Sequence, residues 1–312
     1  MTDSPARVAV TGAAGFIGAA VCARLAADGH DVVALDLRGT PPLDVTDPDA
    51  VARALDGADA IVHTAALVTD WGAMADFVAV NVGGTRNVLD AAAGRPVVHV
   101  SSVAAWGYEF GADVTEDAPT RRTGAPYVDT KGASDDLARR RGATVIRPGD
   151  VYGPGSVPWV IRPIETLRAR LFMLPGDGGG LMTPIYVDDL VDAIVRAVRA
   201  PQAAAGVGLA VHDGAPVAAR DFFAHHARML GRSGVPTAPR PLVEAGAWAV
   251  EALARVRGRT PALSRQAIQY VSRRAVYPND RARELLGWAP QVSLDEGMAR
   301  TEDWLRAGTG RL

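Results

Sequence analysis

Thr11-Gly-Ala-Ala-Gly-Phe-Ile-Gly18 is the stretch that decides the fold, and it directly follows the apolar run Val8-Ala-Val10. A short β-branched run that passes into spaced glycines and then into an alanine-rich segment predicts a strand, a tight turn and a helix. Gly12 permits the turn, Gly15 lets the backbone approach a pyrophosphate, and Gly18 allows close packing of the helix. The N-terminus of that helix stabilises negative charge. We therefore expect a dinucleotide-binding βαβ unit at the start of the chain.

The same alternation of short apolar runs and alanine-rich segments continues to about residue 150. Further strands are predicted at Asp31–Leu35, Ala60–Thr64, Val97–Ser101 and Thr144–Arg147, with an additional short strand before Asp44. These runs are apolar along their whole length, which is typical of parallel strands whose two faces are both covered by helices. The predicted fold class is α/β, with a doubly wound parallel Rossmann sheet.

The pattern changes after Tyr152, where the glycine- and proline-rich stretches 153–158 and 175–180 indicate loops. Residues 184–199 resume a strand-like start and a helix, which indicates that the chain returns to the sheet. A smaller, mainly helical lobe for the substrate is expected around this return. Its helix 242–257 is amphipathic and is predicted to pack with Trp248 on its apolar side.

The predicted boundaries are an NAD(P)-binding Rossmann domain of residues 1–155, a return to it at about 181–213, and a substrate lobe of residues 156–180 and 214–312.

Composition excludes several classes of function. A formal net charge of -2 over 312 residues gives no basic field for nucleic acid, and we see no polybasic stretch for anionic lipid. One cysteine, Cys22, excludes internal disulfides and a multi-thiolate metal site, so no metal is expected. The N-terminus lacks a secretory pattern, and no apolar run approaches the roughly 20 residues of a membrane span. We expect a cytoplasmic protein that acts on a small molecule.

Asp36 ends the second predicted strand, 18 residues after Gly18. A carboxylate there accepts hydrogen bonds from the adenosine ribose hydroxyls and repels a 2′-phosphate, which favours NAD. Arg38 lies two residues further on and could instead reach a 2′-phosphate, so NADP stays open. Asp44 and Val45 are candidates for holding the adenine ring, with a surface turn as the alternative role for the carboxylate.

Tyr127-Val-Asp-Thr-Lys131 follows Pro126, a favoured first residue of a helix, so the tyrosine and the lysine are expected one turn apart on one helix face. Lys131 is the only lysine among the 33 lysines and arginines, and its ammonium titrates where guanidinium does not. A neighbouring ammonium and the positive nicotinamide of a bound cofactor are together expected to lower the pKa of Tyr127. Ser102, at the end of a predicted strand, is placed to donate to a substrate oxygen. A helix-capping role for Ser102 is the alternative.

Seven segments match one enzyme family in the family's order. They are Thr11–Gly18, Asn81–Thr85, Ser101–Gly107, Tyr127 with Lys131, Arg147–Pro154, Tyr186–Asp189 and Leu286–Trp288. From residue 8 to about 305 the chain resembles an extended short-chain dehydrogenase/reductase of the NAD-dependent epimerase/dehydratase family. It is most similar to the branch that contains 3β-hydroxysteroid dehydrogenases and dihydroflavonol reductases.

The resemblance implies that Tyr127 is the general acid/base, that Lys131 holds the nicotinamide ribose and tunes Tyr127, and that Ser102 orients the reacting oxygen. It also implies a homodimer, formed through helices around 81–93 and 127–141. The cofactor-binding residues expected from the motif and the resemblance together are Gly12, Ala14, Gly15, Phe16, Ile17, Gly18, Asp36, Leu37, Arg38, Asp44, Val45, Thr64, Ala65, Ala66, Asn81, Ser101, Tyr127, Lys131, Pro148 and Val151.

Departures from the family narrow the expected reaction. Dehydratases of the family carry an acidic pair where this chain has Val103 and Ala104, which disfavours elimination of water. Nucleotide-sugar 4-epimerases usually have an arginine where this chain has Met182, and a thioether cannot neutralise a diphosphate. Arginines elsewhere could take over that role, although we expect most of them to face solvent. They are Arg168, Arg170, Arg273 and Arg274.

The predicted function is oxidoreduction between a secondary alcohol and a ketone on a small, fairly apolar or cyclic substrate. Residues expected to line the substrate pocket are Trp71, Val103, Trp159 and Met182, each with a core role as the alternative. Two other functions stay open: a nucleotide-sugar 4-epimerase with tightly bound NAD, and a non-catalytic NAD(P)-sensing protein. A non-catalytic sensing protein would be expected to have lost the Tyr127 and Lys131 pair.

Overall fold

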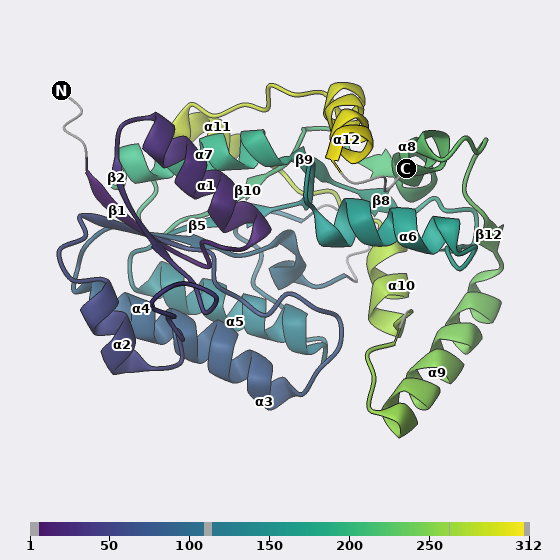
Figure 1. The fold of residues 1–312 in the computed structure, drawn as a ribbon, viewed down its shortest axis with the longest axis horizontal. Helices are drawn as coiled ribbons and strands as arrows, with labels where there is room; N and C mark the ends of the chain where they lie inside the picture. The colour runs from purple at the N-terminus through teal and green to yellow at the C-terminus, as the bar shows by residue number, and fades with distance from the viewer. Residues whose placement is uncertain (1–5, 109–113, 262, 309–312) are drawn as a thin grey trace.

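The computed structural model describes residues 6–108, 114–261 and 263–308, and its main feature is a six-stranded parallel sheet (Figure 1). Its strands, in spatial order, are β10 (Gly208–Val211), β5 (Thr144–Pro148), β4 (Val97–Val100), β3 (Ala60–His63), β1 (Arg7–Thr11) and β2 (Asp31–Leu35). The direction in which strands are added reverses beside β1, whose neighbours are β2 and β3. Ligands of open α/β sheets bind at the carboxyl ends of strands at such a reversal.

Helices cover both faces of this sheet, as Figure 1 shows. On one face α1 (Phe16–Ala27) packs against α7 (Val187–Arg199), and on the other α4 (Thr85–Ala92) lies between α2 (Pro48–Ala54) and α5 (Pro126–Arg140). Each face is buried in its own hydrophobic cluster. The predicted fold class is therefore confirmed.

One predicted strand is wrong, because no strand precedes Asp44 within the described residues. Leu43 and Val45 are buried there, but they belong to an irregular segment between β2 and α2. Pro41 and Pro42 precede them, and proline cannot donate a hydrogen bond to a neighbouring strand.

The rest of the chain forms a smaller, mainly helical part, on the right of Figure 1. Its helices are α6 (Arg162–Arg168), α8 (Ala219–Met229), α9 (Arg240–Arg257), α10 (Arg265–Val271) and α12 (Leu294–Gly308). Three separate two-stranded sheets are also present: β6 (Asp150–Tyr152) with β9 (Pro184–Tyr186), β7 (Leu174–Pro175) with β12 (Thr237–Ala238), and β8 (Leu181–Met182) with β11 (Val217–Ala218). The division of the chain into two domains stays a prediction.

Shorter elements complete the fold: α3 (Met74–Phe77), α11 (Asp280–Leu286), the wide helical turns Val78–Gly84 and Val157–Ile161, and the tight helical turn Val103–Trp106. Among the described residues, no helix is both long enough and apolar enough to cross a bilayer.

Helix α9 corrects one sequence prediction, because Trp248 is 61% exposed rather than packed. The side that packs is formed by Val243 and Ala247, which contact Ile268 of α10. The helix carries apolar residues on more than one side, so its amphipathic pattern did not identify the buried side.

A buried ion pair fixes α5 to the sheet. Arg147 of β5 donates from Nε and Nη2 to the two carboxylate oxygens of Asp135, over 2.8 and 2.7 Å, and both side chains are almost wholly buried. Burial alone would raise the pKa of Asp135, but hydrogen bonds and positive charge from Arg147 hold that pKa below its ordinary value. Since α5 begins at Pro126, this pair sets the position of the helix that carries Tyr127 and Lys131.

Asp135→Asn should lower the free energy of unfolding by about 3–5 kcal/mol, because it leaves the buried Arg147 guanidinium without a counter-charge. Urea unfolding at pH 7 measures this. The neighbouring Asp136→Asn is the control, with an expected loss below about 1 kcal/mol, since Asp136 is 28% exposed. The difference between wild type and Asp135→Asn should shrink as the pH falls through the lowered pKa of Asp135. Equal losses in the two variants would contradict this account.

Candidate active site

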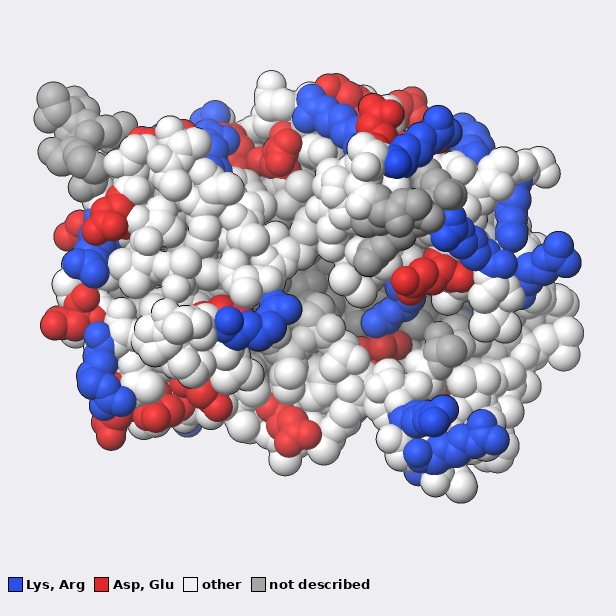
Figure 2. Space-filling view, in the orientation of Figure 1, with Lys and Arg blue, Asp and Glu red and all other residues white. Residues whose placement is uncertain are grey.

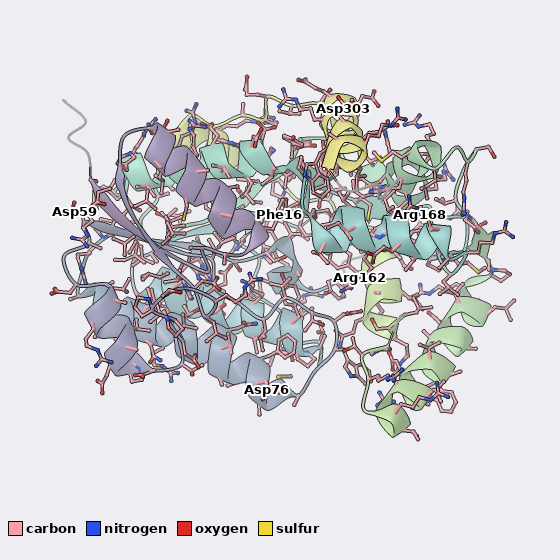
Figure 3. The ribbon with its side chains drawn as sticks, viewed as in Figure 1. Phe16, Asp59, Asp76, Arg162, Arg168 and Asp303 are labelled. Atoms are coloured by element: carbon pink, nitrogen blue, oxygen red, sulfur yellow. The ribbon has the colours of Figure 1, made fainter. Side chains whose placement is uncertain are left out.

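The carboxyl ends of β1, β3 and β4 meet the start of α1 at the boundary with the smaller part of the molecule. Figure 3 shows Phe16, at the beginning of α1, pointing toward that boundary, on whose far side α6 carries Arg162 and Arg168. Most of the predicted site residues follow these strands directly, so the structure brings them to one edge of the sheet.

The glycine loop leaves no room for side chains. A Cβ atom on Gly18 would lie 2.1 Å from the Gly12 carbonyl oxygen, and one on Gly12 would lie 2.7 Å from the Ala65 nitrogen. Gly12 also has a φ of +75°, a conformation that favours glycine. Gly15 is the N-cap of α1 and has no side chain with which to cap the first-turn N–H groups. Those groups are therefore available to an anion.

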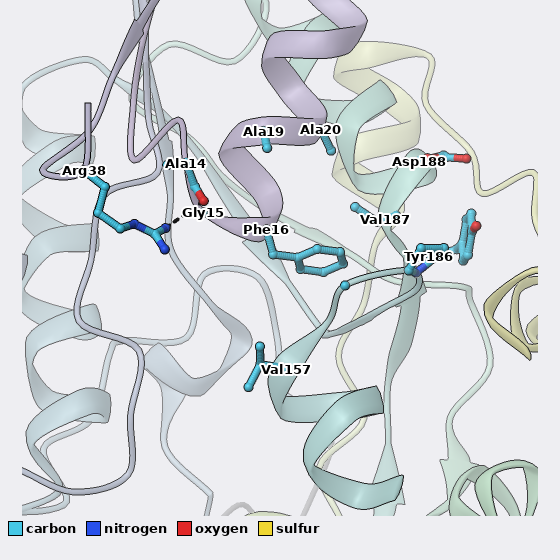
Figure 4. Close-up of a pocket in the computed structure, with 12 residues that line it drawn as sticks. Ala14, Gly15, Phe16, Ala19, Ala20, Arg38, Val157, Tyr186, Val187 and Asp188 are labelled. Carbon is cyan, nitrogen blue, oxygen red and sulfur yellow. Dashed lines mark hydrogen bonds between the residues drawn. The ribbon is translucent and has the colours of Figure 1, made fainter. Parts of the chain in front are cut away.

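Asp36, which is predicted to bind the adenosine ribose, lies beside this loop. Its carboxylate accepts from the backbone N–H groups of Ala14 and Arg38, over 3.0 and 2.9 Å. Burial would raise the pKa of Asp36, but these hydrogen bonds and the Arg38 charge lower it. Arg38 itself donates from Nη2 to the Ala14 carbonyl oxygen over 2.7 Å (Figure 4). The adjacent Leu37 is exposed.

A cavity of about 590 Å³ opens next to the glycine loop (Figure 4). Ala14, Gly15, Phe16 and Arg38 line one side of it, and Tyr186–Asp188 line the other. The adenine-binding candidates are less clearly placed. Asp44 forms a turn in which it accepts from the N–H of Thr46 over 2.9 Å, which matches the alternative role stated for it, and Val45 is buried.

Tyr127, Lys131 and Ser102 come together where β4 meets α5. Lys131 is buried and donates from Nζ to the Val100 carbonyl oxygen over 2.8 Å. The Ser102 side chain forms a hydrogen bond with Tyr127 and also accepts from the Ala104 N–H over 3.1 Å, so Ser102 is both a turn cap and a neighbour of the tyrosine.

The ionisation of this group depends mainly on burial. Burial raises the pKa of Tyr127, the hydrogen bond with Ser102 lowers it, and the Asp150 charge raises it again, with a net rise. Burial lowers the pKa of Lys131 to about 8, against an opposing effect of Asp135. In the protein alone the tyrosine pKa is therefore raised, with burial as the largest cause, whereas the predicted lowering also included the positive charge of bound nicotinamide.

Two buried histidines lie beneath this group. His63 lies 2.7 Å from the Thr11 hydroxyl through Nδ1 and 3.1 Å from the Thr85 hydroxyl through Nε2, and its ring stacks on His99 with 5.3 Å between centroids. Burial, followed by the Lys131 charge, lowers the pKa of His63 to about 3. Both rings are thus neutral, so among His63, His99 and Lys131 only the lysine carries a positive charge.

The remaining predicted cofactor residues have the following surroundings. Thr64 donates from its hydroxyl to the Thr11 carbonyl oxygen over 2.7 Å, with Ala65 and Ala66 following. The Asn81 amide bonds to the backbone of Leu67 in both directions and to the Thr130 hydroxyl, so it ties the loop after β3 to α5. The others are Ile17 in the first turn of α1, Ser101 after β4, Pro148 at the end of β5 and Val151 in β6.

The predicted pocket walls separate into two groups. Trp71 borders a cavity of about 260 Å³ together with Pro126 and Arg255, and Trp159 lies against Tyr270 with 5.2 Å between ring centroids. Val103 and Met182 have no exposed surface and pack in hydrophobic clusters, so these two are core residues instead.

Sequence reasoning missed a buried network that joins β6 to the segment around α10. The Asp150 carboxylate accepts from Arg273 Nη2 over 2.6 Å, from the Thr183 N–H over 2.8 Å and from the Tyr270 hydroxyl. The Arg273 guanidinium lies 3.8 Å above the Tyr270 ring. Arg273, one of the four arginines considered as alternative phosphate ligands, is thus wholly buried and paired with a carboxylate.

Tyr270 connects this network to the predicted catalytic residues. It packs edge-on against Tyr108 with 5.1 Å between ring centroids, and both Tyr270 and Tyr127 pack against the cluster that contains Tyr108. The side of the site beyond Tyr127 is therefore aromatic. No sequence signal pairs Asp150 with residues 120 and 123 positions later.

Comparisons with known proteins agree with this arrangement. The model of the "NAD dependent epimerase/dehydratase family" matches residues 8–208. The chain is 30% identical to a 2-alkyl-3-oxoalkanoate reductase of Stenotrophomonas maltophilia, over 94% of this chain and 98% of the relative. It is 33% identical to a UDP-glucose 4-epimerase of Mycolicibacterium smegmatis, over 96% and 98%.

A third relative is a 3 beta-hydroxysteroid dehydrogenase/Delta 5-->4-isomerase of Mycobacterium tuberculosis, 31% identical over 71% of this chain and 69% of the relative. Among solved structures, MoeE5 in complex with UDP-glucuronic acid and NAD superimposes with a TM-score of 0.77. It is 26% identical, over 97% of this chain and 100% of that chain.

Lys131→Met should raise the free energy of unfolding at pH 7 by about 1–3 kcal/mol, because burial makes the ammonium costly in the folded state. The gain should disappear as the pH rises from about 8, the pKa in the folded protein, to the ordinary lysine value of 10.5. Urea unfolding at pH 7 and pH 10 measures both. Arg140→Met, at an exposed position of the same helix, is the control and should change stability by less than about 0.5 kcal/mol. A Lys131→Met protein that is less stable than wild type at pH 7 would show that the ammonium stabilises the fold.

Proposed function

The chain belongs to the NAD-dependent epimerase/dehydratase family, and on that premise we propose that it is an NAD(P)-dependent oxidoreductase that interconverts a secondary alcohol and a ketone on a small, fairly apolar or cyclic substrate. The resemblance predicted from the motifs is confirmed, and its relatives include a 3β-hydroxysteroid dehydrogenase. The substrate and the type of reaction are the proposed part.

The residues present fit a dinucleotide. The glycine loop forms a cradle that a single Cβ would fill, and the uncapped first turn of α1 offers N–H groups to a pyrophosphate. Asp36 stays ionised beside the loop and suits ribose hydroxyls, which favours NAD. Its Arg38 neighbour is already engaged with the Ala14 carbonyl oxygen, so NADP would require Arg38 to leave that contact.

NAD supplies a hydride acceptor when it is bound, and its reduced form supplies the hydride donor. The chain supplies the proton chemistry. Tyr127 is protonated at neutral pH because its pKa is raised, so it can donate its hydroxyl proton to a ketone oxygen. The Ser102 hydroxyl, bonded to Tyr127, would orient that oxygen. Lys131 would hold a ribose hydroxyl and place its positive charge close to the phenol.

One observation is the main support for the proposed substrate class: the buried Arg273, the cation on the proposed substrate side, is already neutralised by a carboxylate. Asp150 pairs with Arg273, and the surfaces around this pair come from Tyr108, Trp159 and Tyr270. A diphosphate would need a free cation there, whereas an apolar ring or chain packs well on aromatic side chains. Met182 lies 4.0 Å from Arg273 Nη1 through its sulfur, so the position that carries an arginine in many 4-epimerases is occupied by a neutral residue.

A nucleotide-sugar 4-epimerase with tightly bound NAD is the second candidate. The 33% identity to a UDP-glucose 4-epimerase favours it, as does the similarity to a structure that contains a UDP-sugar. The third possibility, an NAD(P)-sensing protein without catalysis, is disfavoured by the intact group of Tyr127, Lys131 and Ser102.

Purified protein with NAD should produce NADH absorbance with hydroxysteroids or other cyclic secondary alcohols, and should consume NADH with 3-oxoacids that carry apolar chains. UDP-glucose should give no UDP-galactose by NMR, because the buried Arg273 is already paired with Asp150 and is not available to a diphosphate. Epimerisation of UDP-glucose together with silence across the alcohol and ketone panel would replace the proposal with the second candidate.

Tyr127→Phe should lower kcat by about 10²–10⁴, the usual contribution of a positioned acid or base, with little change in NAD affinity. Steady-state kinetics and the fluorescence of bound NADH measure the two quantities. Tyr152→Phe is the matched control, because among the described residues its buried hydroxyl has no hydrogen-bond partner. A Tyr127→Phe enzyme with wild-type kcat would remove the phenol from the mechanism.

A further inference from the structure

Helix α9 has an apolar side that is not covered by any described part of the chain. Leu242, Leu253 and Val256 are 66%, 49% and 86% exposed, and Ala249 between them is also exposed. At 3.6 residues per turn these four positions fall on one stripe along the helix, and the exposed Trp248 lies about 80° further round the helix from the nearest of them. A continuous stripe of this kind marks a contact surface more often than scattered exposed leucines do.

The C-terminal end of the same helix is positively charged. Arg255, Arg257 and Arg259 lie within five residues, and Figure 2 shows blue side chains gathered over this lower end of α9 while the rest of the helix is white. Within the described residues, Arg257 and Arg259 form no ion pair. The sequence prediction that no basic stretch suits anionic lipid overlooked this local group, because the net charge of the whole chain is close to zero.

The acidic residues of α9 offset only part of this charge, because Glu251 pairs with Arg255 over 3.4 Å and leaves Arg257 and Arg259 without an acidic neighbour among the described ion pairs. Glu251 is buried and accepts from both the backbone N–H and the side chain of Arg265, over 2.7 and 3.0 Å, so it serves to hold α10 against α9. Glu244 is paired with Arg240 at the other end of the helix. The exposed side of α9 is therefore apolar along its length and basic at one end.

We infer that α9 docks on the surface of a bilayer that contains anionic lipid. Its apolar stripe inserts at the boundary between headgroups and acyl chains, Trp248 lies at the level of the headgroups, and Arg257 and Arg259 contact lipid phosphates. The helix lies flat on the bilayer, since no described helix is suited to crossing one.

A second copy of the chain fits this surface less well. A stripe one helix wide and 18 residues long measures roughly 27 Å by 10 Å, about a third of the roughly 800 Å² that each partner buries in a standard interface. The expected dimer surface, around 81–93 and 127–141, also lies on other helices. An acidic lipid surface supplies the opposite charge that Arg257 and Arg259 lack within the described chain.

Flotation of the full-length protein with vesicles tests this inference. The protein should float with vesicles of phosphatidylcholine and phosphatidylglycerol but remain at the bottom with phosphatidylcholine alone. Binding should weaken several-fold in 1 M NaCl, because the Debye length falls from about 10 Å at 0.1 M to about 3 Å. The double variant Leu253→Gln/Val256→Gln and the double variant Arg257→Glu/Arg259→Glu should each reduce the bound fraction about tenfold, while NADH affinity stays unchanged.

Matched controls carry the same changes elsewhere on the surface. Leu171→Gln/Leu285→Gln alters two other exposed leucines, and Arg53→Glu/Arg306→Glu alters the net charge equally, so both should float like wild type. Absence of vesicle binding by wild type, or binding that both α9 variants retain, would overturn the inference. Light scattering tests whether a second copy of the chain covers the stripe instead. If wild type does not bind vesicles but forms a dimer that the α9 variants lose, the stripe is a contact between two copies.

Discussion

The position of the candidate active site depends on the carboxylate of Asp135. It accepts two hydrogen bonds from Arg147 of β5, and Arg139 of its own helix adds a third. Tyr127, Lys131 and Asp135 are spaced four residues apart along α5, so one face of this helix carries the phenol, the ammonium and the anchoring charge in succession. Asp135 also opposes the loss of the proton from Lys131, whose burial favours the neutral amine. One buried anion thereby fixes the helix to the sheet and supports the cation next to the candidate acid.

Much of the Rossmann part could be predicted because its signals are local. The glycine loop, the continuous apolar strands and the pair at Tyr127 and Lys131 each occupy a few consecutive residues, and their physical requirements show directly in residue type. The predictions of a strand before Asp44 and of a packed Trp248 failed because the pattern of apolar residues in the sequence did not show which structure or which side of a helix is buried. Leu43 and Val45 are as buried as strand residues, yet two prolines precede them, and Trp248 lies in an amphipathic helix whose covered side only the neighbouring α10 determines.

The network around Asp150 was less predictable because its contacts join positions that are distant in the sequence. Asp150, Tyr270 and Arg273 become a network only when β6 and α10 are brought together, and neither the aspartate nor the arginine belongs to a spacing that would signal the other. The pKa of Tyr127 in the protein alone was unpredictable for a related reason. Its direction depends on burial, a Ser102 hydrogen bond and the Asp150 charge together, and the sequence indicates none of these three effects.

The arginine-rich composition acquires a physical meaning once the surroundings of particular arginines are compared. Arg147 and Arg273 are both buried, and each faces a carboxylate, as the cost of burying an unpaired charge requires. Water screens the exposed Arg257 and Arg259, so the fold itself requires no partner for them. The stripe beside them is different, since exposing Leu253 and Val256 to water carries a cost that no contact within the described chain offsets. An anionic bilayer surface removes that cost and supplies the counter-charge in the same contact, which is why the two features of α9 are explained together by lipid.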